Sequence, residues 1–122
     1  MIYAGQEFCD QNQPSLFDID RINWSGRDIS DEIAALAAVK KAHYPENAYF
    51  SAEAVDEKHT VIARCGNKNT CLLGIFTLRG TAECLDVDIP DGEYENLLSG
   101  ETVEIKNGTV KTSGKPLVLK IK

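Results

Sequence analysis

Cysteine and histidine are the residues of this 122-residue chain best suited to bind a metal ion or to act as nucleophiles. The chain contains Cys9, Cys65, Cys71, Cys84, His43 and His59. Their spacings do not match the Cys-x-x-Cys pattern of structural zinc sites, so we expect no metal and no cofactor. Cys65 and Cys71 can face each other across a hairpin, so one disulfide between them is geometrically conceivable. We favour free thiols in an apolar core, as in a cytoplasmic protein.

Paired carboxylates are the second arrangement that can do chemistry, because two of them can share the roles of nucleophile and general acid. Asp86 and Asp88 fall on one face of a predicted strand, as do Asp18 and Asp20 if their segment is extended. Aspartate commonly decorates solvated surfaces, and we interpret both pairs as surface charge. Neither histidine has a plausible nucleophile as partner. The sequence therefore predicts no catalytic residue.

The composition is that of a globular protein whose charge does not suit nucleic acid. Hydrophobic residues make up 43% of the chain, and 13 basic against 19 acidic residues give a net charge of −6. Phosphate binding needs clustered Lys and Arg, whereas Lys40-Lys41 is the only adjacent basic pair. No apolar run approaches the roughly 20 residues that span a bilayer. No secretory signal is visible after Met1. We expect neither nucleic acid nor a membrane as partner.

The first part of the chain predicts a strand, a long loop and one helix. Residues 2–4 form a short apolar stretch, and a polar loop follows from 6 to 26. Apolar residues then recur at helical spacing over 28–43, where Asp28 can cap the helix and Pro45 cannot continue it. Such a strand and helix do not bury each other. In this order they form one βα unit, the building block of a parallel (β/α)8 barrel.

From residue 48 onward the pattern changes to short strands and turns. The strand candidates are residues 49–55, 60–65, 70–78, 84–89, 101–105 and 117–121. Asn107-Gly108 is the strongest hairpin signal, because a type I′ turn needs a positive φ at both positions. About seven or eight such strands predict a mainly β fold, an antiparallel β-sandwich of Greek-key type. Its core is expected to include the aromatic residues Tyr49, Phe50, Phe76 and Tyr94.

The opening motif resembles the last barrel strand of the α-amylase family, glycoside hydrolase family 13. Residues 2–8, with the sequence IYAGQEF, match the Tyr-x-Gly-x-Glu end of that strand. The family's Gly-x-Pro lead is missing, because the chain starts inside the strand. Residues 14–18 and 22–24 resemble the following loop, and the predicted helix resembles the eighth barrel helix. Residues 91–101, with the sequence DGEYENLLSGE, resemble a segment of the family's C-terminal sandwich.

The resemblance implies two domains and a parent enzyme. Residues 1–45 would be the terminal strand, loop and helix of the catalytic (β/α)8 barrel, and residues 46–122 the C-terminal β-sandwich. The parent would hydrolyse α-glucosidic bonds with retention, using one carboxylate as nucleophile and another as acid/base. In the family these carboxylates come from strands four, five and seven, and no residue here matches those motifs. The fragment is therefore expected to be inactive alone, with the rest of the barrel as its partner and an α-glucan as the parent's substrate.

Three residues are candidates for a supporting role near the substrate. Gln6 and Glu7 follow the resembled strand at its carboxyl end, the active-site face of a barrel. We expect them to orient the loop by hydrogen bonds rather than to act in the chemistry. Trp24 can stack on a sugar ring, or, as we favour, anchor the loop onto the rest of the protein. Substrate, linkage, calcium dependence, the choice between hydrolysis, transfer and phosphorolysis, and whether Met1 is the native start stay open.

Two other functions are compatible with the sequence. A stand-alone carbohydrate-binding β-sandwich predicts exposed, roughly coplanar aromatic side chains on the sandwich, although aromatic residues make up only 7% of the chain. An unrelated interaction domain is the third hypothesis. In every case residues 1–45 carry apolar side chains that a barrel would cover, and we expect the fragment to self-associate through them.

Overall fold

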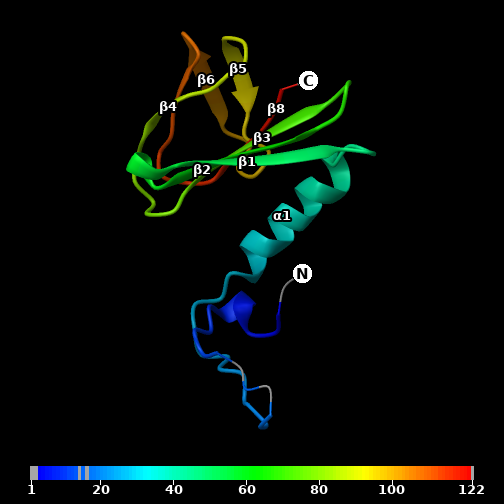
Figure 1. The fold of residues 1–122 in the computed structure, drawn as a ribbon, viewed down its shortest axis with the longest axis vertical. Coiled ribbons are helices and arrows are strands. Elements are labelled where there is room, and N and C mark those ends of the chain that lie inside the picture. The colour runs from blue at the N-terminus through cyan, green and yellow to red at the C-terminus, as the bar shows by residue number, and fades with distance from the viewer. Residues whose placement is uncertain (1–2, 14, 16, 122) are drawn as a thin grey trace. The chain divides into compact units, whose positions relative to one another are not determined.

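The computed structural model describes residues 3–13, 15 and 17–121 of the chain. Contacts divide it into two compact units, Met1–Ala38 and Val39–Lys122, and the division falls inside the helix α1. Figure 1 shows the chain as a ribbon. The elements are η1 (Gln6–Phe8), α1 (Ser30–His43), β1 (Tyr49–Val55), η2 (Asp56–Lys58), β2 (Thr60–Gly66), β3 (Cys71–Thr77), β4 (Cys84–Asp86), β5 (Gly92–Glu95), β6 (Thr102–Lys106), β7 (Thr109–Lys111) and β8 (Leu117–Lys120).

The second unit contains two antiparallel sheets of four strands each. Sheet A has the order β1-β2-β3-β8, and sheet B has the order β4-β7-β6-β5. In sheet B the hairpin-connected strands β5, β6 and β7 lie side by side. The strand before them, β4, pairs with β7, which gives a Greek-key order. The predicted mainly β fold, an antiparallel sandwich of seven or eight strands, is confirmed.

The turn between β6 and β7 forms as its sequence predicts. Asn107 and Gly108 have φ values of 53° and 68°, both in the left-handed region that a type I′ turn requires. The Asp91 carboxylate accepts hydrogen bonds from both backbone N–H groups, at 2.8 Å from Asn107 and 2.9 Å from Gly108. These bonds lower the pKa of Asp91 below its ordinary value. One ionised side chain thus ties this turn to the segment that leads into β5.

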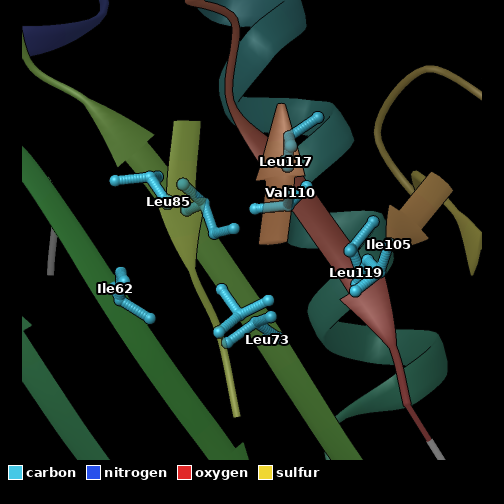
Figure 2. Close-up of a cluster of buried hydrophobic side chains, with 9 residues drawn as sticks. Ile62, Leu73, Leu85, Ile105, Val110, Leu117 and Leu119 are labelled. Atoms are coloured by element: carbon cyan, nitrogen blue, oxygen red, sulfur yellow. The ribbon is translucent and has the colours of Figure 1, made fainter. Parts of the chain in front are cut away.

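The core lies between the two sheets. Sheet A contributes Ile62, Leu73, Ile75, Leu117 and Leu119, and sheet B with the residue after β4 contributes Leu85, Val87, Ile105 and Val110. Figure 2 shows this cluster of buried side chains, seven of which it labels. Leu85 and Val87 are buried while Cys84, Asp86 and Asp88 are exposed, as their period-two alternation predicts. Burial of this apolar surface is the main source of stability in the unit.

The helix α1 begins two residues later than predicted, at Ser30 rather than 28, and ends at His43 as expected. Asp28 Oδ1 accepts hydrogen bonds from the Ser30 N–H at 2.9 Å and the Ser30 hydroxyl at 2.6 Å. These two bonds hold the pKa of Asp28 below its usual range. Asp28 therefore satisfies a backbone donor at the helix start, as its predicted capping role requires.

The predicted strand at residues 2–4 is not seen in its described part. Ile2 lies outside the described residues, whereas Tyr3 is irregular and a turn begins at Ala4. A single strand is stable only when neighbouring strands take up its backbone hydrogen bonds. No strand among the residues that the structure describes lies beside this segment, which explains the difference.

Two predicted core aromatics are instead exposed. Tyr49 and Phe50 begin β1, the strand at the edge of sheet A, and Phe50 is 68% exposed. The core side chains of sheet A come from β2, β3 and β8, whereas β1 lies at the opposite edge and keeps both faces open. Phe76 and Tyr94 are half-buried, and Tyr94 packs against the core. The local pattern predicted the strands correctly but not which of them would lie at an edge.

The four cysteines are free thiols in the structure, but their predicted place in the core is wrong, because Cys9 and Cys84 are exposed and Cys65 and Cys71 are only half-buried. Cys65 pairs with Leu72 across the β2–β3 hairpin, and Cys71 pairs with Gly66. Because neighbouring positions of a strand point to opposite faces, the Cys65 and Cys71 side chains lie on opposite sides of sheet A. This geometry does not allow a disulfide between them without backbone movement.

Candidate functional site

Gln6 and Glu7 lie in η1, a single 3₁₀ turn, and both side chains bind backbone groups just before it. The Tyr3 N–H donates to Gln6 Oε1 at 2.9 Å, and the Gly5 N–H donates to Glu7 Oε2 at 2.9 Å. The carbonyl oxygen of Glu7 accepts a hydrogen bond from the Ile29 N–H at 2.8 Å. The two candidate side chains therefore hold the turn in place, and the backbone of Glu7 links it to the start of α1.

Trp24 makes its aromatic contact with Phe8, the last residue of η1. The two ring centroids are 5.3 Å apart and the planes are nearly perpendicular at 86°, an edge-to-face arrangement. Gly26 lets the backbone after Trp24 lie against the Phe8 carbonyl oxygen, because a Cβ at position 26 would lie 1.8 Å from that oxygen. Trp24 is still 53% exposed, so much of its surface remains open.

Asp10 is an organising residue that the sequence did not single out. Its Oδ1 accepts a hydrogen bond from the Asn12 N–H at 3.0 Å, and its Oδ2 accepts one from the Asn23 N–H at 3.1 Å. These backbone bonds lower the pKa of Asp10 below its ordinary value. The spacing Asp-x-Asn at the start of a polar loop is typical of an Asx-turn and was the available signal. The bond to Asn23 joins positions far apart in the loop and has no local signature.

A groove of about 490 Å³ lies between the first residues and α1 within the unit Met1–Ala38. Its lining residues are Tyr3, Ala4, Glu7, Ser30, Ile33, Ala34 and Ala37. Glu7 is the only carboxylate among them, whereas retaining glycoside hydrolysis needs two. Over the described residues, no three His, Cys, Asp or Glu side chains gather closely enough to hold a metal ion. The groove is thus mainly apolar surface with one carboxylate at its side.

A second groove, of about 870 Å³, runs beside β6 and β7 in the sandwich. It is lined by Glu101, Thr102, Val103, Glu104, Lys106, Asn107, Thr109, Lys111, Ser113 and Leu117. None of these lining residues is aromatic, so the groove lacks the flat rings on which sugars stack. Nowhere in the described part of the chain is a helix both long enough and apolar enough to cross a bilayer.

The sandwich matches a known protein family. A family model described as the bacterial alpha amylase C-terminal domain matches residues 51–119, more than half of the chain. The chain belongs to this family. The predicted relation to the α-amylase family is therefore confirmed for the sandwich, which is a C-terminal domain of the α-amylase type. Comparison with curated proteins gives no match.

Solved structures extend the likeness beyond the family model. An alpha-amylase from Lactobacillus plantarum is 26% identical, with a TM-score of 0.71 over 98% of this chain. A noncanonic maltogenic alpha-amylase, AmyB from Thermotoga neapolitana, is 16% identical, with a TM-score of 0.69 over 98% of this chain. At that identity the second likeness shows a shared fold alone. The chain spans only 28% and 32% of the lengths of these two proteins.

The α-amylase C-terminal domain and the candidate site residues occupy different parts of the chain. The family model begins at residue 51, whereas Gln6, Glu7 and Trp24 all lie in the unit Met1–Ala38. A likeness over 98% of the chain must include most of that unit as well. Within it the structure brings Glu7 to the start of α1 and Trp24 to Phe8. It supplies no second carboxylate to the Glu7 groove.

Proposed function

We propose that this chain is the C-terminal part of a longer α-amylase-type glycoside hydrolase. The observation that carries the proposal is a family match over 51–119 together with a likeness, over 98% of the chain, to an alpha-amylase of which the chain spans 28%. In this proposal residues 1–45 end the catalytic barrel and residues 46–122 are an accessory sandwich. The parent cleaves α-glucosidic bonds with retention, through carboxylates that lie outside this chain.

In the same proposal the groove beside Glu7 is covered by the rest of the barrel. Its apolar lining, including Ile33 and Ala37, is the kind of surface that a barrel buries between neighbouring elements. Gln6 and Glu7 hold the turn at the active-site end of the last strand, which their hydrogen bonds to Tyr3 and Gly5 support. The thiols stay reduced, as in the cytoplasm.

The direct test compares the longer protein with this chain alone on soluble starch. Release of reducing sugar is expected from the longer protein and not from the chain alone. Removing residues 46–122 from the longer protein is expected to lower the temperature at which activity is lost, because the sandwich stabilises the barrel. A longer protein that hydrolyses no α-glucan, or a chain that does so alone, would contradict the proposal.

A substitution of Trp24 distinguishes an anchoring role of this residue from sugar stacking. Because its ring packs against Phe8, Trp24→Ala in the longer protein should reduce thermal stability and leave the KM for starch unchanged. Ser25→Ala, at the neighbouring exposed position, is the control. A raised KM with unchanged stability would instead assign Trp24 to the sugar.

The stand-alone carbohydrate-binding function has no comparable support. The groove beside β6 and β7 has no aromatic lining, and its Lys, Glu and Thr side chains do not offer a stacking platform. The exposed Tyr49 and Phe50 are consecutive residues of β1 and point to opposite faces of sheet A, so they do not form a coplanar pair. Titration calorimetry of the chain with maltoheptaose is therefore expected to give no binding heat. A saturable heat signal would restore that alternative.

A further inference from the structure

One edge of sheet A is unpaired along the whole length of β1. The seven residues Tyr49–Val55 pair with β2 on one side, and no strand within the described ranges pairs with the other side. Six of the seven are exposed and only Val55 is half-buried, so both faces of the strand are open. An edge of this kind presents backbone N–H and C=O groups that can pair with another chain.

The other strand edges of the sandwich are protected from pairing with another chain. The edge of β8 is covered, because Asn96 bridges to Leu119 and the Leu97 N–H donates to the Val118 carbonyl oxygen at 2.8 Å. The edge strands β4 and β5 are only three and four residues long, and both carry acidic residues. In contrast β1 has seven residues, no proline and a single charge, Glu53.

We propose that β1 pairs antiparallel with β1 of a second copy of this chain, joining two copies of sheet A into one continuous sheet. Residues opposite each other in such a pair lie on the same face, so their numbers must add to an even value. Only the register centred on Ala52 pairs all seven residues. It sets Tyr49 opposite Val55, Phe50 opposite Ala54, Ser51 opposite Glu53 and Ala52 opposite its own copy.

This register is complementary in size and charge. The exposed Phe50 meets the small Ala54 of the other copy, on the face of sheet A that points away from the core. A shift by two residues in either direction would leave two strand residues of each copy unpaired, and in one direction it would also set Glu53 against Glu53. In the centred register Glu53 meets Ser51, an uncharged partner.

Arg64 adds an attraction across the new pair. It lies opposite Ser51 in its own copy, and its guanidinium is 3.9 Å from Glu53 of that copy. In the proposed sheet the second copy's Glu53 lies on the same face, two strands away at roughly 10 Å between Cα atoms. Both side chains are long enough to close that distance. The two-fold symmetry makes the Arg64–Glu53 attraction occur twice, so a second copy fits this edge in charge as well as in hydrogen bonding.

The proposal does not depend on the proposed enzymatic function, and introducing a charge at Ala52 tests it. Ala52 is exposed, and the register places it beside its own copy. Sedimentation velocity of the complete chain should show a concentration-dependent dimer. Ala52→Lys and Ala52→Glu should each weaken dimerisation by about tenfold or more, because like charges face each other. An equimolar mixture of the two variants should restore the dimer, which variants that simply failed to fold cannot do.

Ala37→Lys is the matched control, because it makes the same change in the groove of the unit Met1–Ala38. It should leave the β1 dimer intact. A chain that is monomeric at every concentration would overturn the proposal. So would a dimer that Ala37→Lys abolishes while Ala52→Lys does not, since self-association would then use residues 1–45. Failure of the mixed variants to restore the dimer would also overturn it.

Discussion

The two units of this chain are organised by different interactions. The unit Val39–Lys122 has a core of nine buried apolar side chains held between two sheets. In the described part of Met1–Ala38 no apolar side chain is buried, and the segment is organised by side-chain hydrogen bonds to backbone and one aromatic contact. Hydrogen bonds contribute far less net stability than burial of a core. We therefore expect the sandwich to fold by itself and the first unit to need surroundings that complete it.

The same substitution in the two units gives the largest contrast. Leu73 is fully buried at the centre of β3, whereas Leu36 is 45% exposed on α1. Leu73→Ala should lower the free energy of unfolding by about 2–5 kcal/mol, because it removes buried apolar volume and leaves a cavity. Leu36→Ala should change it by no more than about 0.5 kcal/mol. Urea denaturation followed by circular dichroism measures both. Equal losses would mean that the first unit shares the core.

Gly26→Ala should disturb the first unit without affecting the sandwich. The added Cβ would lie 1.8 Å from the Phe8 carbonyl oxygen, so the loop that carries Trp24 must move. Trp24 is the only tryptophan, and its fluorescence emission should shift while the unfolding free energy stays within about 0.5 kcal/mol. Ser25→Ala adds no Cβ and serves as control. An unchanged emission spectrum would contradict the Phe8–Trp24 packing.

The contrast between the units also explains what sequence reasoning could and could not predict. Within the sandwich, local signals agree with the global fold: alternation predicts the buried Leu85 and Val87, and Asn107-Gly108 predicts its turn. The exposure of Phe50 was missed, because the edge position of β1 is set by the order of strands in sheet A, which local sequence does not encode. The prediction of a strand at residues 2–4 was wrong for its described residues, because a strand needs neighbouring strands to stabilise it.

The candidate site was predictable only in its location. The motif at residues 2–8 singled out Gln6 and Glu7, but not that Glu7 Oε2 accepts a hydrogen bond from the Gly5 N–H. Side chains that fold back on their own backbone leave no periodic pattern. The Asp10 bond to Asn23 spans 13 residues and depends on the whole loop conformation. Their roles in an intact enzyme stay predictions.

Asp91 should make the sandwich sensitive to acid through a single turn. Its pKa is lowered in the folded protein, mainly by the hydrogen bonds from Gly108 and Asn107. The stabilisation is therefore present above the pKa of the unfolded chain and is lost as the pH falls through the lower, folded value. Asp91→Ala should lower the melting temperature at neutral pH, and the difference from the parent should vanish in strong acid. The exposed Asp88→Ala is the control. A difference that persists at every pH would mean that the carboxylate charge is not responsible.

The cysteines should give the smallest effect on stability. Cys65 and Cys71 lie on opposite faces of sheet A, so reducing agent should leave the melting temperature of the chain unchanged. Thiol alkylation followed by mass spectrometry should label the exposed Cys9 and Cys84 before the half-buried pair. Recovery of a peptide linked through Cys65 and Cys71 would show that the hairpin geometry is wrong.

Hydrogen exchange tests most directly whether this chain joins a self-sufficient sandwich to a segment that the rest of an enzyme completes. Amide exchange, followed by mass spectrometry, should be compared in the chain alone and in the longer protein. In the chain alone the strands β2, β3 and β8 should be strongly protected, and peptides from residues 3–38 should exchange much faster. In the longer protein the protection of residues 3–38 should rise, with β3 little changed. Equal protection of residues 3–38 and β3 in the chain alone would contradict the account.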